Sequence, residues 1–395
     1  MCVEETFNAL AKVWTGRQTH VDQQTQRLFK RKAALGGAFG LAGLTLAGCD
    51  VDAPSGTLGK ALRFGWPEGV TPEAHAMGNF WVWTWVAAWI LGAIMWGLML
   101  WCLFAYSAKR AEKQGKGEFP RQTGYNIGLE LVLTVIPIII VMGMFFFTVQ
   151  TQDKVTALDK DPKVSVDVTA YQWNWKFGYG SIDGEFTPNG ENYVGTDKER
   201  QEAVDRAGEF DDTTRGEEGT AHHGEAKGPI HGKSAADLSY LHFDKIETLG
   251  TSDEVPVLVI PANTPVEFDL ASADVVHSFW VPEFLFKRDA FPHPERNKSE
   301  RKFQVESVDE GAYVGRCAEM CGTYHAMMNF EVRAVSPELF KQYIEFRMDN
   351  PEASNGQALA AIGQKAAAET TKPFKTGRTD TRGVEEGSNA VELNG

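Results

Sequence analysis

The sequence predicts a transmembrane helical hairpin followed by an all-β Greek-key sandwich. Two apolar segments indicate the hairpin, because residues 80–106 and 125–149 are each long enough to cross a bilayer, which takes about 20 residues. The sandwich is indicated by short runs rich in β-branched and aromatic residues, which recur between Pro and Gly turns from residue 163 to residue 335. A chain of 395 residues can hold two or three domains.

The composition limits the kinds of partner. The net charge of −14 at pH 7 argues against nucleic acid and against a basic membrane-surface patch, and it favours a cationic partner. The five cysteines are not expected to form a disulfide framework, since they are scattered among separate predicted segments. We assign no function to Cys102, which lies in the first apolar segment.

Residues 1–48 are predicted to be a signal peptide. A basic cluster at residues 30–32 precedes an apolar run over residues 33–46, which is too short for a membrane span and has the length of a signal core. The following Leu-Ala-Gly-Cys49 resembles a bacterial lipobox, which implies a diacylglycerol on Cys49 as the mature N-terminus. The alternative is an uncleaved third membrane anchor.

Residues 49–78 are polar and predict an external arm, and residues 79–150 form the hairpin. A Trp-rich start suits the first helix to the membrane interface. The connecting loop carries five basic residues against two acidic ones, and positively charged loops stay in the cytoplasm. Both ends of the hairpin, and the domain that follows, are therefore expected outside.

Glu130 is the exception in the second apolar segment. It lies about two turns before Pro137, and an ionisable residue inside a span is by default a functional hypothesis because its burial is costly. The alternative is a carboxylate at the level of the lipid headgroups without any role in proton transfer.

The β domain is predicted from residue 151 to residue 335. Residues 163–170 alternate between Val and polar residues, which predicts a half-buried strand. An aromatic cluster, Tyr171-Gln-Trp173-Asn-Trp175-Lys-Phe177, follows it. Further strands are expected at residues 257–260, 266–270, 275–281, 303–308, 312–316 and 328–335. In the C-terminal part, residues 336–395, Ser336-Pro337 begins a helix to about Met348, and a short Ala-rich helix and a flexible tail follow.

Residues 181–250 interrupt the β pattern. They contain sixteen acidic and seven basic residues with little periodicity, so we interpret them as an acidic, partly ordered insert. His222, His223 and His231 in this insert are either a second metal site or, as we favour, solvated side chains.

One stretch concentrates metal-binding chemistry. Cys317, Cys321, His325 and Met328 follow the spacing C-x3-C-x3-H-x2-M, and His277 lies upstream in Asp-Val-Val-His-Ser-Phe-Trp-Val-Pro. Thiolate, thioether and imidazole ligands suit copper. This set has one ligand too many for a single blue copper, but it is the right number for two coppers bridged by both sulfurs. A disulfide between the two cysteines is the alternative.

The loop and the His277 segment resemble subunit II of cytochrome c oxidase, which carries the dinuclear copper centre called CuA. The resemblance implies a cupredoxin fold for residues 151–335. It also implies the copper ligands, which are the side chains of His277, Cys317, Cys321, His325 and Met328 and the backbone carbonyl of Glu319. The Glu319 carboxylate is in turn expected to bind magnesium at the interface with subunit I. Asp274 is expected either to accept a hydrogen bond from His277 or to form a turn.

The same resemblance assigns roles to residues outside the copper loop. Trp173 matches the position where electrons from cytochrome c are accepted, although an aromatic residue there could also fill the sandwich core. Asn174 departs from the family, in which many members carry Tyr. Glu130 matches the residue at the entrance of a proton-uptake path into subunit I. The long insert is similar to that of actinobacterial members, which associate with a cytochrome bc complex bearing a dihaem cytochrome c.

The function implied is electron transfer in a bacterial plasma membrane. Ferrocytochrome c is oxidised at the dicopper centre, electrons pass to haem in subunit I, oxygen is reduced to water, and protons are pumped, with subunit III as a further partner. Oxygen chemistry is not expected on this chain, which has no haem-binding C-x-x-C-H. The alternatives are a metal-free quinol oxidase subunit II and a copper carrier or assembly protein.

Overall fold

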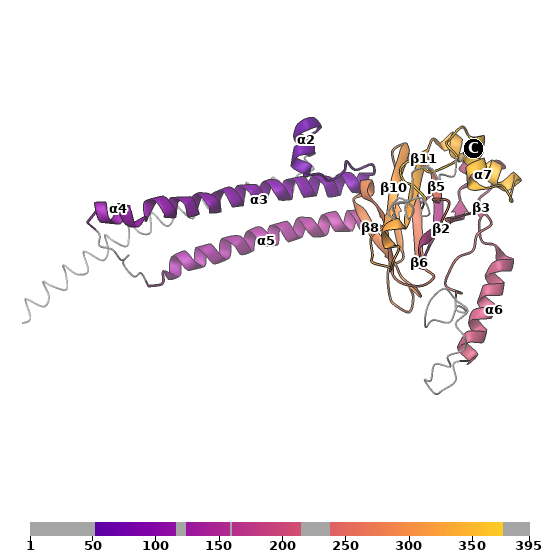
Figure 1. Ribbon diagram of the computed structural model, residues 1–395, viewed down its shortest axis with the longest axis horizontal. Helices are drawn as coiled ribbons and strands as arrows, with labels where there is room; N and C mark the ends of the chain where they lie inside the picture. The colour runs from indigo at the N-terminus through magenta and orange to yellow at the C-terminus, as the bar shows by residue number, and fades with distance from the viewer. Residues whose placement is uncertain (1–51, 116–123, 159, 215–237, 374–395) are drawn as a thin grey trace, which may run out of the picture. The chain divides into compact units, whose positions relative to one another are not determined.

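The computed structural model describes residues 52–115, 124–158, 160–214 and 238–373 (Figure 1). The chain divides into two units, one made of the residues up to Gly65 and Asn79–Gln152, the other of Trp66–Gly78 and the residues from Asp153 onward. The predicted signal peptide with Cys49, the residues His222, His223 and His231, and the end of the tail lie outside the described residues.

The first unit is helical and contains the predicted hairpin. Its helices are α2 (Gly56–Arg63), α3 (Pro72–Ala105), α4 (Ala108–Lys113) and α5 (Ile127–Thr156). The two long helices are apolar and long enough to cross a membrane. Large apolar side chains are exposed all round them, including Trp96, Trp101 and Phe145, as expected for helices that face lipid. α3 begins eight residues before the predicted start, because Pro72 is favourable at the first helical position.

The second unit is a β-sandwich of two sheets with parallel and antiparallel pairs. One sheet has the order β3 (Tyr193–Val194), β2 (Asn174–Ile182), β1 (Val164–Tyr171), β6 (Val266–Ser272) and β9 (Lys302–Val305), with β4 (Glu247–Leu249) also paired to β2. The other has the order β5 (Val257–Pro261), β11 (Asn329–Val335), β10 (Gly311–Cys317), β7 (His277–Val281) and β8 (Phe286–Ala290). This arrangement confirms the predicted sandwich.

The core lies between the two sheets. Alternate residues along each strand point inward, and aromatic rings from both sheets meet there. The rings of Phe268 and Phe303 stack at 4.6 Å, and those of Phe279 and Phe330 also lie 4.6 Å apart. Trp175 is completely buried beside them. Because both faces of this core are rigid sheets, the loops at its ends are held in defined positions.

The segment Trp66–Gly78 is part of the sandwich unit. The Val70 amide donates to the carbonyl of Glu283, and the Val70 carbonyl accepts from the amide of Asp309, both at 3.1 Å. Glu73 is buried, pairs with Lys160 at 3.6 Å and accepts from the amide of Glu306. The polar arm before the hairpin therefore ends as a strap along the β domain.

The C-terminal part begins with the expected helix, α7 (Pro337–Asp349), which Ser336 caps by accepting from the amide of Leu339. A short helix, α8 (Asn355–Ala361), follows and has a capping box between Ser354 and Gln357. The chain then returns to β11. There the carboxylate of Glu331 accepts from the amides of Glu369 and Thr370, so residues after α8 are fixed on the sandwich.

The described ends of the predicted acidic insert contain regular secondary structure. They form η1 (Gly184–Phe186), β3, α6 (Lys198–Thr214) and β4, and the expected boundary at residue 181 falls inside β2. Before β4 pairs with β2, the returning segment of residues 238–250 contacts the first sheet, with His242 on Asp167 and the Tyr240 hydroxyl donating to the Ser272 carbonyl. For this reason Asp167 and Thr169 are buried along with the apolar side of β1, where we expected a half-buried strand. Sequence alternation cannot reveal a cover that comes from a distant segment.

Candidate metal centre

The strand ends bring the metal-binding residues together. Cys317 is the last residue of β10, His277 is the first residue of β7, and these two strands pair directly beside them. The loop that follows Cys317 contains a short 3-10 helix, η3 (His325–Met327), and returns to β11. The amide of Cys317 donates to the carbonyl of Met328 at 3.1 Å, which closes the loop at its base.

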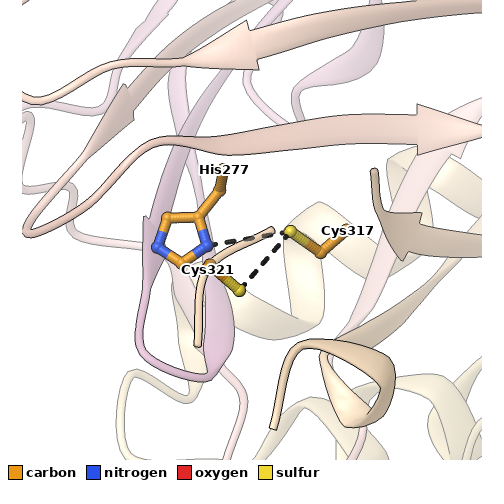
Figure 2. Close-up of side chains that lie close together, drawn as sticks. All are labelled: His277, Cys317 and Cys321. Atoms are coloured by element: carbon orange, nitrogen blue, oxygen red, sulfur yellow. Dashed lines mark hydrogen bonds between the residues drawn. The ribbon is translucent and has the colours of Figure 1, made fainter. Parts of the chain in front are cut away.

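The side chains of this loop converge with His277 (Figure 2). The two sulfurs of Cys317 and Cys321 lie 3.8 Å apart. Nδ1 of His277 lies 3.7 Å from the Cys317 sulfur, and Nδ1 of His325 lies 3.5 Å from the Cys321 sulfur. The Met328 sulfur is 3.9 Å from Cys321, and the Glu319 carbonyl is 3.2 Å from Cys317. Each thiol therefore has its own imidazole, and one further weak donor lies beside each.

The disulfide alternative is not formed in the structure. A disulfide requires sulfurs about 2.05 Å apart, and Cys317 and Cys321 are both free and buried. The donor set contains two thiols, two imidazoles and a thioether, all of them soft or borderline ligands. These residues fit copper, and they are poor ligands for magnesium or calcium.

A carboxylate behind His277 fixes the ring. Nε2 of His277 lies 2.8 Å from Oδ1 of Asp274, so Nδ1 is the nitrogen that faces the cysteines. Asp274 also accepts from the amides of Gln172 and Val275, both at 2.7 Å. Burial opposes a charge on His277, but the hydrogen bonds to Asp274 and Cys317 outweigh burial and raise its pKa. Asp274 thus fills both of the roles that the sequence left open.

The short contact between the two thiols separates their pKa values. The hydrogen bond shared with Cys321 holds the pKa of Cys317 well below its usual range, against the opposing effect of burial. The same bond, together with burial, raises the pKa of Cys321. One thiolate therefore forms readily, whereas two thiolates require a cationic partner such as a metal ion.

Trp173 lies against the cysteine loop and is half-buried. Its indole N–H donates to the carbonyl of Cys321 at 3.1 Å, and its ring meets Tyr324 edge-on at 5.0 Å. Gly322, with φ of +117°, lies under the ring, and a Cβ there would come within 3.3 Å of the indole. Trp173 also packs against the core, in which Trp175 is completely buried.

Two residues near the site were not found by sequence reasoning. The side-chain amide of Gln172 donates to the Cys321 carbonyl at 2.6 Å, and the Trp175 indole donates to the Met328 carbonyl at 3.4 Å. Neither residue type signals metal chemistry by itself, so only its neighbours in the fold identify its role.

Two further residues singled out from the sequence, Glu319 and Glu130, carry carboxylates. The Glu319 side chain is exposed. Glu130 is in the first turn of α5, where its carboxylate accepts from the amide of Asn126 at 3.2 Å. Such a contact satisfies one backbone donor at the helix N-terminus.

The fold and the site define a class. A β-sandwich that carries thiols, imidazoles and a thioether at one end, in a chain with two apolar helices, is a cupredoxin-like metal-binding domain of a membrane protein.

The comparisons with known proteins specify this class further. Residues 237–335 match the family described as "Cytochrome C oxidase subunit II, periplasmic domain". Proteins named cytochrome c oxidase subunit 2 from Corynebacterium diphtheriae, C. glutamicum and C. efficiens are 64%, 63% and 61% identical, each over 92% of this chain and 98% of the relative. The chain belongs to the cytochrome c oxidase subunit II family.

This assignment confirms the resemblance noted from the metal loop. The protein is a subunit of an oxidoreductase complex, a membrane protein whose β domain lies outside the cytoplasm. The family implies a copper centre and other oxidase subunits as partners.

Proposed function

We propose that this chain accepts electrons from a cytochrome c at a dinuclear copper centre and passes them to haem in subunit I, where oxygen is reduced with proton pumping. The observation that carries the proposal is the pair of sulfurs 3.8 Å apart, each with its own imidazole nitrogen within 3.7 Å. Copper held by these residues would supply a one-electron redox change.

The chain's own residues would hold and orient this group. The proposed ligands are His277, Cys317, Cys321, His325, Met328 and the carbonyl of Glu319. The sulfurs and the His277 ring are buried, which excludes water. The closed loop and the two sheets keep the ligand positions nearly constant, so little rearrangement accompanies a change of charge.

Trp173 is the proposed point of electron acceptance. It is half-buried, and its indole hydrogen bond ends on the backbone of Cys321, so one residue joins the domain surface to a sulfur ligand. The proposed donor is a cytochrome c, specifically the dihaem cytochrome of a bc complex in a supercomplex, which the acidic insert would contact.

Three further roles belong to this proposal. The exposed carboxylate of Glu319 would bind magnesium at the interface with subunit I, and subunit III would complete the complex. Glu130 would lie at the entrance of the proton path. Cys49 would carry a lipid after cleavage of the signal peptide.

The copper content of the purified full-length protein tests the proposal. We expect two coppers per chain and the spectrum of a mixed-valence thiolate-bridged pair, because both sulfurs lie between the two imidazoles. Cys321→Ser should abolish this spectrum, whereas the matched variant Cys102→Ser should keep it. A single blue copper, or a protein that binds no copper and behaves as a quinol oxidase subunit, would contradict the proposal.

A further inference from the structure

A second cluster of ligand side chains lies on the outer face of the first sheet, away from the cysteines. β1 and β6 are parallel neighbours, and Asp167 stands directly opposite Asp269 in their register. The neighbours of each Asp along its strand are core residues, so both carboxylates point outward. His242, from the returning end of the insert, lies over them with Nδ1 2.8 Å from Asp167. One ligand atom from each of these three residues lies within 4.8 Å of the other two.

A third carboxylate, that of Asp244, lies beside this cluster and has no hydrogen-bond partner among the described residues. Asp244 is 1% exposed, and among the described residues no donor lies within hydrogen-bond distance of either carboxylate oxygen. It sits over Gly178, which is opposite Asp167 in the β1–β2 register, and a Cβ on Gly178 would fall 2.0 Å from Oδ2 of Asp244. The glycine thus leaves a space that the carboxylate fills on the side of Asp167. Burial, followed by repulsion from Asp167, raises the Asp244 pKa to about 7.

Among the described residues, the ion pairs near this cluster involve carboxylates other than that of Asp244. Arg301 contacts Asp269 through Nε, and Lys302 is 3.8 Å from the same carboxylate. Lys176 pairs with Glu247 at 2.7 Å. His242 is the partner of Asp167, which leaves the Asp244 carboxylate without a cation in contact.

The cluster is open to solvent on one side. A surface cavity of about 360 Å³ reaches His242 and is lined also by Tyr240, His293, Glu295 and Arg301. The His242 side chain is 41% exposed, whereas those of Asp167 and Asp269 keep only 10% and 6% of their surface. His242 is therefore the ligand that an ion meets first from solution.

We propose that Asp167, His242 and Asp269 bind a divalent first-row transition-metal ion, of which Zn²⁺ is the best match, with the buried Asp244 carboxyl group beside them. One imidazole and two carboxylates are established zinc ligands, and imidazole selects against magnesium and calcium. On binding, Asp269 exchanges the Arg301 guanidinium for the ion, and Arg301 keeps its contact with Glu295 at 2.9 Å. The ion joins the returning end of the insert to β1 and β6 and so has a structural role.

Metal analysis of the full-length protein in its oxidase complex tests this site. The complex is freed of loosely bound metal with a chelator, incubated with Zn²⁺ and separated from excess by gel filtration, and zinc and copper are then measured together. We expect the native chain to hold one zinc more per chain than His242→Asn or Asp269→Asn. The matched variants His75→Asn and Asp349→Asn, both at exposed positions, should hold as much zinc as the native chain.

Copper serves as the internal control. Equal zinc in the native chain and in His242→Asn would overturn the proposal, and so would zinc uptake that is matched by loss of copper from the cysteine loop. If Asp269→Asn loses copper through misfolding, the half-exposed His242→Asn variant still decides. Zn²⁺ should also raise the melting temperature of the native complex, and this increase should be absent in His242→Asn.

Discussion

At the scale of single residues, Asp274 connects the proposed ligand His277 to the segment that contains Trp173. Its carboxylate orients His277 from behind, and it also binds the amide of Gln172, next to the Trp173 that covers Cys321. A ring held through Nε2 can present only Nδ1 to a metal, so the carboxylate selects both the tautomer and the direction of the ligand.

Replacing Asp274 by Asn should weaken metal retention without unfolding the domain. An amide keeps the size of the side chain but removes the charged acceptor for His277, and the loss of such an acceptor typically lowers metal affinity by about 10- to 100-fold. Competition with a copper chelator measures the effect. The exposed Asp349→Asn variant should retain copper like the native protein, and an unchanged Asp274→Asn would show that the carboxylate serves only the turn.

Asp244 should make the stability of the domain depend on pH. Its folded-state pKa is about 7, above the ordinary value of 3.8, so between these values the folded chain keeps a proton that the unfolded chain has released. Stability should therefore fall as the pH rises through this window, by on the order of 4 kcal/mol. Denaturant unfolding in the presence of a chelator checks this. Asp244→Asn should flatten the profile, and Asp349→Asn should leave its slope unchanged.

At the scale of elements, β11 follows the cysteine loop directly and also contacts the segment after α8. Arg333 and Glu331 form a buried ion pair on this strand, and Arg333 also donates to the carbonyls of Lys365 and Ala367. Both side chains are at most 2% exposed. A buried pair of this kind fixes a segment in place because neither charge can be left alone.

Glu331→Gln should therefore destabilise the β domain strongly. The change removes the buried counter-ion of Arg333 and leaves only the partly exposed Glu369 carboxylate, 3.7 Å away. Breaking a buried pair typically costs about 3–5 kcal/mol. The free energy of unfolding, followed by near-ultraviolet circular dichroism, measures this cost. The exposed Glu345→Gln variant on α7 should change it by less than about 0.5 kcal/mol. A similar value for both variants would mean that the segment after α8 contributes little.

The sequence predicted the strands that have their own alternation, such as β1, β6 and β11, and the capped helix α7. It did not predict β3, β4 or β8. The first two are very short and exist because they pair with β2, and β8 carries three charged residues, Lys287, Arg288 and Asp289, among its five. The spacing of Cys317, Cys321, His325 and Met328 identified the metal loop, because all four lie on one local segment. The cluster around Asp167 could not be found in this way, since its members come from three distant segments.

At the scale of the whole molecule, the proposed electron and proton functions lie in different units. The cysteine loop belongs to the sandwich unit and Glu130 to the helical unit. Variants in the two units should therefore have separable effects on the complex.

Glu130→Gln should slow turnover of the oxidase and its proton uptake, while the copper spectrum stays native. An amide keeps the helix-start contact with Asn126 but cannot release a proton. Oxygen consumption and proton release by the complex in vesicles measure the effect. The matched variant Glu112→Gln, in the exposed helix α4, should behave like the native protein. Native turnover in Glu130→Gln would leave this carboxylate with its capping role alone.

The strap formed by Trp66–Gly78 affects how a water-soluble version should be made. A fragment cut at Asp153 would discard residues that precede the first long helix, leaving the Asp309 amide without its Val70 acceptor and Lys160 without Glu73. A better truncation would delete the apolar helices and splice the strap onto the start of the sandwich through a flexible linker. Residues 66–78 precede the first long helix in the chain, but in three dimensions they belong to the β domain.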